Sequence, residues 1–229
     1  MADLIANLAD LQWLNRYLGS HWLLCTAVQG LWRRAGRPTR LRVLDVGTGA
    51  GDIPAVLQHW AAHRGIALTV IALDQHHGVL QYLHTAPATT PNVAYVQADG
   101  LRLPFPPRTF DIVVCSTMLH HLDWEHGVAL LRSMAAVARY GVVVNDLLRG
   151  WLHYYAARLL LALTGCHPVT RHDGAMSVLR AYRVQEVREM ARQAALAPVR
   201  VSAALGYRFV LVYEPPAAPP HQYLSRCRA

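Results

Sequence analysis

The chain of 229 residues contains no lysine: its 22 basic residues are all arginine, and the formal net charge is +8 at pH 7. It also lacks a run of eighteen uncharged apolar residues, which argues against a membrane-spanning helix. Its first residues, Met-Ala-Asp-Leu, lack the basic start of a signal peptide. These absences predict a cytoplasmic protein without a stable membrane anchor.

Two further absences concern cysteine and metal chemistry. The four cysteines, at positions 25, 115, 166 and 227, are widely separated and show no Cys-x-x-Cys spacing. Cys115 falls in an expected buried strand, where a thiol behaves as a small hydrophobe. The thirteen histidines are scattered, with no compact His/Asp/Glu motif at metal-ligand spacing. We therefore expect no required metal.

The arginines cluster most densely between Arg33 and Arg42, where N-terminal helices are expected to meet the first strand. Such a cluster is typical of a solvated linker, and a phosphate-binding patch is the alternative. The positive charge by itself does not indicate a nucleic-acid partner, and we expect none.

Length and hydrophobic patterning predict one α/β domain with a sizeable core. Apolar runs typical of strands alternate with segments of helical spacing. Strands are expected at 41–46, 69–74, 93–99, 110–116 and 141–146, followed by a hairpin of 199–204 and 208–213. Helices are expected within 3–35 and 53–60, and at 127–137, 151–164 and 183–195.

The first strand runs into a glycine-rich turn and then a helix. The glycines at 47, 49 and 51 do not match the G-x-G-x-x-G fingerprint of dinucleotide sites, and no P-loop lysine follows them. Asp45 and Asp52 flank the turn and would repel an anionic diphosphate. A cationic ligand is favoured instead.

The pattern Asp45-x-Gly47-x-Gly49-x-Gly51 resembles motif I of the class I S-adenosylmethionine-dependent methyltransferases. The resemblance implies a doubly wound, mostly parallel, seven-stranded Rossmann-like sheet with a closing antiparallel hairpin. It also implies that Asp74, after the second strand, binds both ribose hydroxyls, and that Asp99 lies against the adenine amine. The full set of cofactor-binding residues implied is Asp45, Gly47, Thr48, Gly49, Gly51, Asp74, Gln75, Asp99, Gly100 and Ser116.

The same resemblance suggests how the domain is organised. We expect an N-terminal helical cap over 1–40, the methyltransferase domain over 41–215 with an acceptor lid at about 148–182, and a proline-rich tail over 216–229. The apolar helix at 151–164 is expected to bury itself within the lid. In the cap, polar residues 15–17 either reach toward the ligands or simply hold the cap on the domain, and an apolar side is expected from Leu11, Leu14, Leu18, Trp22 and Leu23.

Candidate bases follow the fourth strand. The run Met118 to Leu122 resembles a segment of the small-molecule methyltransferases of the ubiquinone and menaquinone biosynthesis type. Within it, His120 or His121 is either a general base or part of the pocket lining. A second polar cluster, over 167–180, is expected in a loop and contains His172, a further candidate base.

Missing motifs narrow the acceptor. After the fourth strand there is no Asn/Asp-Pro-Pro-aromatic motif of the nucleic-acid amino methyltransferases, and the Pro-Cys nucleophile of the cytosine-C5 enzymes is missing too. These absences argue against methylation of nucleic-acid bases. We expect methyl transfer to an oxygen or activated carbon of a small aromatic, quinol or polyketide-like metabolite. An RNA or protein methyltransferase and a non-catalytic cofactor-binding subunit stay open as alternatives, as do the acceptor's identity and the choice between monomer and homodimer.

Overall fold

The computed structural model describes residues 2–85 and 90–216. Within them, seven strands form one sheet in the order β3-β2-β1-β4-β5-β7-β6. The strands are β1 (Arg40–Val46), β2 (Ala67–Asp74), β3 (Val93–Gln97), β4 (Phe110–Ser116), β5 (Ala138–Leu147), β6 (Val199–Ala204) and β7 (Arg208–Tyr213). The first five are parallel, and β7 runs antiparallel between β5 and β6. This confirms the doubly wound sheet and its closing hairpin.

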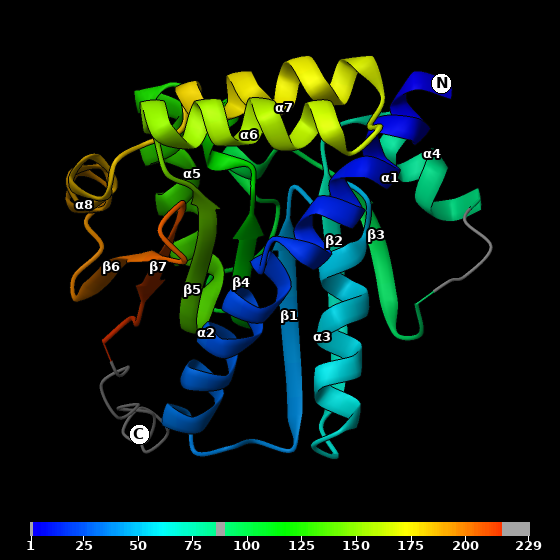
Figure 1. Ribbon diagram of the computed structural model, residues 1–229. Helices are drawn as coiled ribbons and strands as arrows, with labels where there is room; N and C mark the ends of the chain where they lie inside the picture. The colour runs from blue at the N-terminus through cyan, green and yellow to red at the C-terminus, as the bar shows by residue number, and fades with distance from the viewer. Residues whose placement is uncertain (1, 86–89, 217–229) are drawn as a thin grey trace, which may run out of the picture.

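Helices cover both faces of the sheet, which explains why the central strands are almost continuously apolar. On one face, α2 (Ser20–Arg34) and α3 (Asp52–Ala62) bury leucines and Trp60 against β1, β2 and β4. On the other face, α5 (Trp124–Val137) and α8 (Val184–Gln193) pack on β4, β5 and β7. Figure 1 shows these layers, with α4 (His77–Thr85) beside β3.

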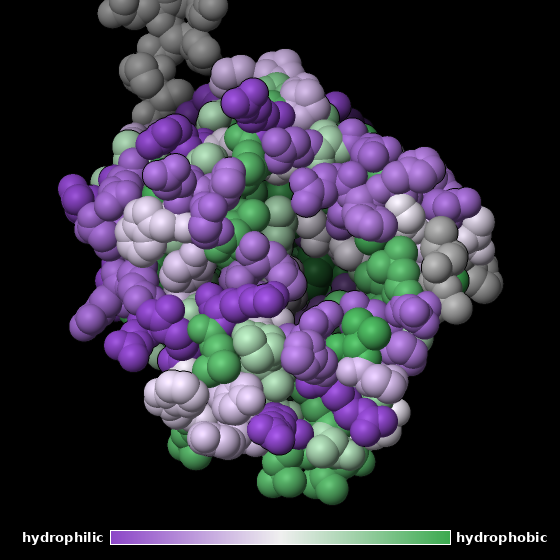
Figure 2. Space-filling model, turned by 90° about the horizontal axis from the view of Figure 1, so that it is seen from above, coloured by the Kyte–Doolittle hydropathy of each residue, from purple (hydrophilic) through white to green (hydrophobic). Residues whose placement is uncertain are grey.

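A third group of helices lies over the carboxyl ends of the parallel strands (Figure 1). It consists of α6 (Trp151–Leu163) and α7 (Pro168–Arg180), with α1 (Ala2–Tyr17) packed against α7. Figure 2 looks onto this side and shows a hollow near its middle with a hydrophobic floor. In such sheets, ligands bind at the carboxyl edge where strand order reverses, here between β1 and β4.

The N-terminal segment is helical, as expected, and consists of the two helices α1 and α2. The helix breaks at Gly19, whose φ of +70° no continuing helix allows. As expected, Leu14 and Leu23 are buried, whereas Leu11 is 39% and Trp22 is 62% exposed. The predicted apolar side is therefore wrong at Leu11 and Trp22.

Three other local expectations are wrong. Residues 168–180 form helix α7 rather than a loop, because Pro168 suits the first turn and the His167 side chain accepts a hydrogen bond from the Val169 N–H. The third strand ends at Gln97, since Asp99 begins a 3-10 turn. Helix α6 is not buried as expected: Leu161 is its one buried residue.

No helix within residues 2–85 and 90–216 has the length and apolar character needed to cross a bilayer. Apart from Pro216, the expected proline-rich tail, including Cys227, lies outside the described residues.

Candidate active site

The glycine loop is fastened to the end of β2. The N–H groups of Gly47 and Thr48 donate to the Leu73 carbonyl at 2.8 and 2.9 Å. The Gly49 N–H donates to Asp74 Oδ2 at 3.1 Å. The structure thus brings the glycine loop, which follows β1, into contact with Asp74 at the end of β2.

The three glycines of the loop have different surroundings, although all have positive φ. A Cβ on Gly47 would lie 2.5 Å from Met118 Sδ, and one on Gly51 would lie 2.7 Å from Leu83 Cδ2. A Cβ on Gly49 would meet nothing within 4 Å. The outer glycines therefore permit close packing, whereas the middle glycine borders open space beside Asp74.

Buried polar groups next to the loop favour a cation there. Asp45 is 1% exposed, and its Oδ2 has no hydrogen-bond partner among the described residues. Burial raises the pKa of Asp45 to about 7, and the negative charges of Asp52 and Asp74 add to the rise. The Thr48 side chain opposes this rise in the pKa of Asp45 without cancelling it. A positively charged ligand would stabilise this negative cluster, which fits the sulfonium of S-adenosylmethionine.

The other expected cofactor residues lie along the same edge. Asp74 is half-buried, and its Oδ1 accepts a hydrogen bond from the His76 N–H at 2.9 Å. Gln75 and Asp99 are exposed, and Asp99 Oδ1 accepts the Leu101 N–H at 2.9 Å. Gly100 is buried, and a Cβ there would lie 2.9 Å from Val46 Cγ1. Each Asp74 oxygen keeps acceptor capacity for a ligand hydroxyl.

Ser116 belongs to a buried polar network instead of standing free at the edge. Its hydroxyl lies 3.1 Å from Ser20 Oγ, and the Asn145 amide donates to Ser20 Oγ at 2.7 Å and to Ser116 Oγ at 3.3 Å. The network ties the start of α2 to β4 and β5. Sequence reasoning missed Ser20 and Asn145, although Asn145 was visible as an amide inside an apolar strand.

The two candidate histidines differ in their surroundings. His120 is 5% exposed; its Nδ1 lies 2.7 Å from Asp146 Oδ1, and its backbone N–H donates to Asp146 Oδ2 at 3.1 Å. Burial alone would raise the pKa of Asp146, but the contacts with His120 and the Leu147 N–H outweigh it and hold that pKa below its usual value. Because Nδ1 faces the carboxylate, Nε2 is the nitrogen left to accept a proton.

His121 is exposed, and its ring lies 4.1 Å from the His120 ring. Loss of water around part of the ring and repulsion by His120 lower the pKa of His121. The α7 residues Asp173 and Arg180 also act on it, in opposite directions. At neutral pH the uncharged form is favoured.

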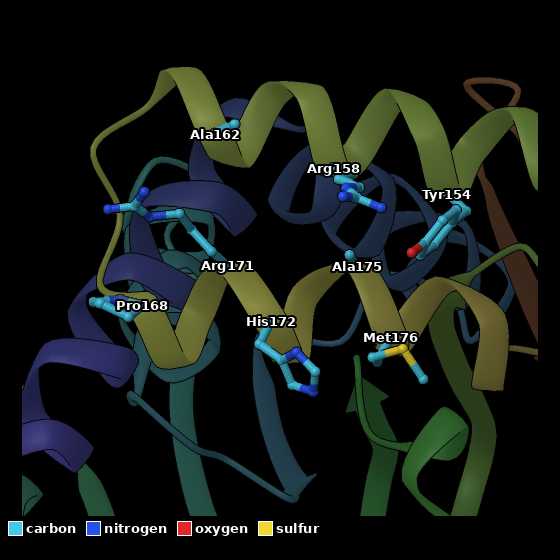
Figure 3. A pocket seen from close by; sticks show the side chains of 8 residues that line it. All are labelled: Tyr154, Arg158, Ala162, Pro168, Arg171, His172, Ala175 and Met176. Carbon is cyan, nitrogen blue, oxygen red and sulfur yellow. The ribbon is translucent and has the colours of Figure 1, made fainter.

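His172 lies elsewhere, on the exposed side of α7. It lines an open cavity of about 570 Å³ between α6 and α7, together with Tyr154, Arg158 and Arg171 (Figure 3). No residue of the glycine loop lines this cavity. The structure therefore separates His172 from the loop and groups it with arginines.

The helical cap is fastened to the loop through Asp52. Asn15 Nδ2 donates to Asp52 Oδ2 at 3.2 Å, and His21 Nε2 lies 2.6 Å from the same oxygen. Arg16 and Tyr17 are exposed. Asn15 therefore holds the cap on the domain, and His21, which the sequence analysis missed, acts with it.

Among residues 2–85 and 90–216, no three His, Cys, Asp or Glu side chains gather at metal-binding range. That the protein requires no metal stays a prediction.

Comparison with known proteins finds a family model that matches part of the chain. Residues 43–141 match the methyltransferase domain family. The ubiquinone/menaquinone biosynthesis C-methyltransferase of Shewanella frigidimarina is 33% identical over 123 residues, which is 50% of this chain and 47% of that protein. The counterpart in Shewanella baltica is 30% identical over 122 residues, again 50% and 47% of the two chains. The chain thus spans about half the length of the curated relatives it matches.

Solved structures share the fold at low identity. An S-adenosylmethionine-dependent methyltransferase from Aquifex aeolicus superposes with a TM-score of 0.54 at 19% identity, covering 76% of this chain and 81% of that one. Magnesium protoporphyrin IX methyltransferase from Synechocystis, with bound S-adenosylhomocysteine, gives 0.54 at 17%, covering 86% and 84%. With the strand order, these similarities show that the chain has the Rossmann-like α/β fold of these methyltransferases.

Proposed function

We propose that the protein transfers a methyl group from S-adenosylmethionine to an oxygen or activated carbon of a small aromatic, quinol or polyketide-like acceptor. One observation carries the proposal. The open space over Gly49, the Asp74 carboxylate and the buried pair of His120 and Asp146 all belong to the carboxyl edge of the same parallel sheet.

The cofactor side is assigned to the loop and Asp74. When bound, S-adenosylmethionine supplies a methyl group already activated by its sulfonium. Asp74 accepts hydrogen bonds from the ribose hydroxyls, and Gly49 lets the ligand approach the backbone closely. Asp45 provides a negative charge that a nearby cation stabilises.

The acceptor side is assigned to the histidines. His120 receives the acceptor's proton on Nε2 while Asp146 holds the opposite ring nitrogen and stabilises the charged ring that results. His121, which is exposed beside His120, contacts the acceptor without taking its proton. The assignment rests on the buried carboxylate partner that fixes the orientation of His120, because His121 pairs with no carboxylate in the part of the chain that the structure describes.

The names of similar proteins support a small acceptor. Relatives carry out C-methylation in ubiquinone and menaquinone biosynthesis, and a structural neighbour with a TM-score of 0.58 at 10% identity is the methyltransferase domain of the citrinin polyketide synthase.

The test is a methyl-transfer assay with radiolabelled S-adenosylmethionine and a panel of phenols, catechols and hydroquinones. For an acceptor that is methylated, His120→Gln is expected to lower kcat about 100-fold or more, the usual contribution of a general base. His121→Gln, a matched change at the adjacent residue, is expected to alter KM more than kcat. A large kcat loss in His121→Gln alone would move the base to that residue, and transfer to RNA or protein but to no small acceptor would refute the proposed acceptor class.

A further inference from the structure

Helix α6 presents an unusually apolar surface to solvent. Six large side chains, here called the α6 ridge, are between 36% and 79% exposed, although apolar side chains of this size normally pack inside a domain. The ridge consists of Trp151, Leu152, Tyr155, Leu159, Leu160 and Leu163.

The surroundings of the ridge are basic. Residues 149–183 contain five arginines and a single acidic residue, Asp173. Arg158 and Arg171 form no ion pair with a carboxylate among the described residues, and both line the cavity between α6 and α7. In Figure 3 the Arg158 side chain extends from α6 toward α7, on which His172 lies. The acidic residues of α1, Asp3 and Asp10, lie at the far end of this layer, beside His167.

The dimensions suit a helix that lies on a bilayer instead of crossing it. Thirteen residues at about 1.5 Å each span roughly 20 Å, less than the ~30 Å of a hydrocarbon core. Tryptophan and tyrosine favour the interface between lipid and water, and arginine complements anionic headgroups. The α6 ridge provides the tryptophan and the tyrosine, and its flanks provide the arginines.

The positive charge of the α6–α7 face favours an anionic lipid surface over a second copy of the chain as its partner. A symmetric dimer through α6 would place the same basic face on both partners, which like-charge repulsion opposes. An anionic lipid surface neutralises the arginines and covers the ridge at once.

We propose that the α6–α7 face docks on anionic membrane surfaces. The α6 ridge inserts into the headgroup layer, and Arg158 and Arg171 contact lipid phosphates. Because α7 also packs on the turn that carries His120 and His121, docking brings this end of the molecule close to lipid. The inference does not depend on the methyl-transfer proposal and is tested without cofactor.

The experiment measures binding of the purified full-length protein to vesicles by flotation. Vesicles of phosphatidylglycerol mixed with phosphatidylcholine are compared with vesicles of phosphatidylcholine alone, at 0.1 and 0.5 M NaCl. We expect binding to the anionic vesicles that is at least tenfold weaker at the higher salt. Trp151→Glu is expected to weaken it at least tenfold, and Arg158→Gln with Arg171→Gln, which leaves the ridge intact, at least fivefold.

Trp22→Glu is the matched control, because Trp22 on α2 is 62% exposed against 70% for Trp151. It is expected to leave vesicle binding unchanged. Absence of binding to anionic vesicles, equal loss in the Trp22 and Trp151 variants, or full binding by the double arginine variant would overturn the proposal. A dimer in light scattering that Trp151→Glu dissociates, without vesicle binding, would assign the face to a second copy and overturn it too.

Discussion

Replacing Asp146 by asparagine tests the buried pair at the heart of the candidate site. The carboxylate accepts three hydrogen bonds: one from the His120 backbone N–H at 3.1 Å, one from His120 Nδ1 at 2.7 Å and one from the Leu147 N–H at 2.7 Å. Asparagine keeps one acceptor oxygen, but its N–H₂ group replaces the other oxygen and cannot accept a hydrogen bond from His120 or Leu147. A hydrogen bond to a charged group is worth about 1.5–3 kcal/mol, and breaking a buried pair costs about 3–5 kcal/mol. We therefore expect Asp146→Asn to lower the free energy of unfolding by about 3 kcal/mol.

The assay is thermal unfolding followed by circular dichroism. For a chain of this size each kcal/mol shifts Tm by about 2–4 °C, so a fall of about 6–12 °C is expected. Asp123→Asn is the matched control, because Asp123 contacts His126 at 2.8 Å with its side chain 66% exposed. Asp123 caps α5 by accepting the His126 N–H at 2.9 Å, and asparagine caps a helix about as well, so this change should cost less than about 0.5 kcal/mol. Equal Tm shifts in the two variants would refute the reasoning.

Acid provides a second readout of the same pair. The pKa of Asp146 is lower in the folded protein than its ordinary value, so the carboxylate stabilises the fold above pH ~4. That stabilisation is lost as pH falls through the folded-state pKa. The stability difference between the wild type and Asp146→Asn should therefore shrink in acid, and a difference that grows would contradict the assignment.

Three further predictions concern the cofactor side. Asp74→Ala should weaken binding of S-adenosylhomocysteine at least about tenfold in calorimetry, since a lost hydrogen bond to a carboxylate costs about 1.5–3 kcal/mol. Gly49→Ala should weaken the same binding and lower Tm, because its φ is +50° and the new Cβ enters the open space. Asp45→Asn should gain stability relative to the wild type as pH rises from about 4 to 7, because the folded pKa of about 7 makes ionisation of Asp45 oppose folding in that range.

Matched variants separate these effects from general damage. Asp111→Ala removes a carboxylate that accepts the Arg42 N–H at the start of β4, away from the loop, and should leave affinity unchanged. Gly65→Ala has a φ of +65° and equally open surroundings, so it should lower Tm without changing affinity. A stability difference between Asp45→Asn and the wild type that stays constant between pH 4 and 8 would count against burial of the charged carboxylate.

Strands were predicted well because their signals are local. The hairpin at 199–204 and 208–213 has the expected bounds, and Gly206, with a φ of +81°, lies in the turn between its strands. Helix α7 was missed because its polar residues are typical of a loop. Packing against α6 and α1 stabilises the helix there, and such contacts between distant segments cannot be predicted from local composition.

The site was predictable in its residue types and less so in its pairings. Asp74 and the glycine loop follow from motif order, but the partnership of His120 with Asp146 depends on β5 lying beside β4. The link from His21 to Asp52 depends on how the cap docks. We expected α6 to be buried because apolar helices are usually internal. The structure leaves it largely exposed, since whether other elements cover a helix depends on the tertiary fold.

The most direct test of the central claim is calorimetric titration of the purified protein with S-adenosylhomocysteine, with NAD as the control ligand. The geometry of the loop and Asp74 predicts saturable binding of S-adenosylhomocysteine in the micromolar range and none of NAD. No binding of S-adenosylhomocysteine, or a preference for NAD, would contradict the account.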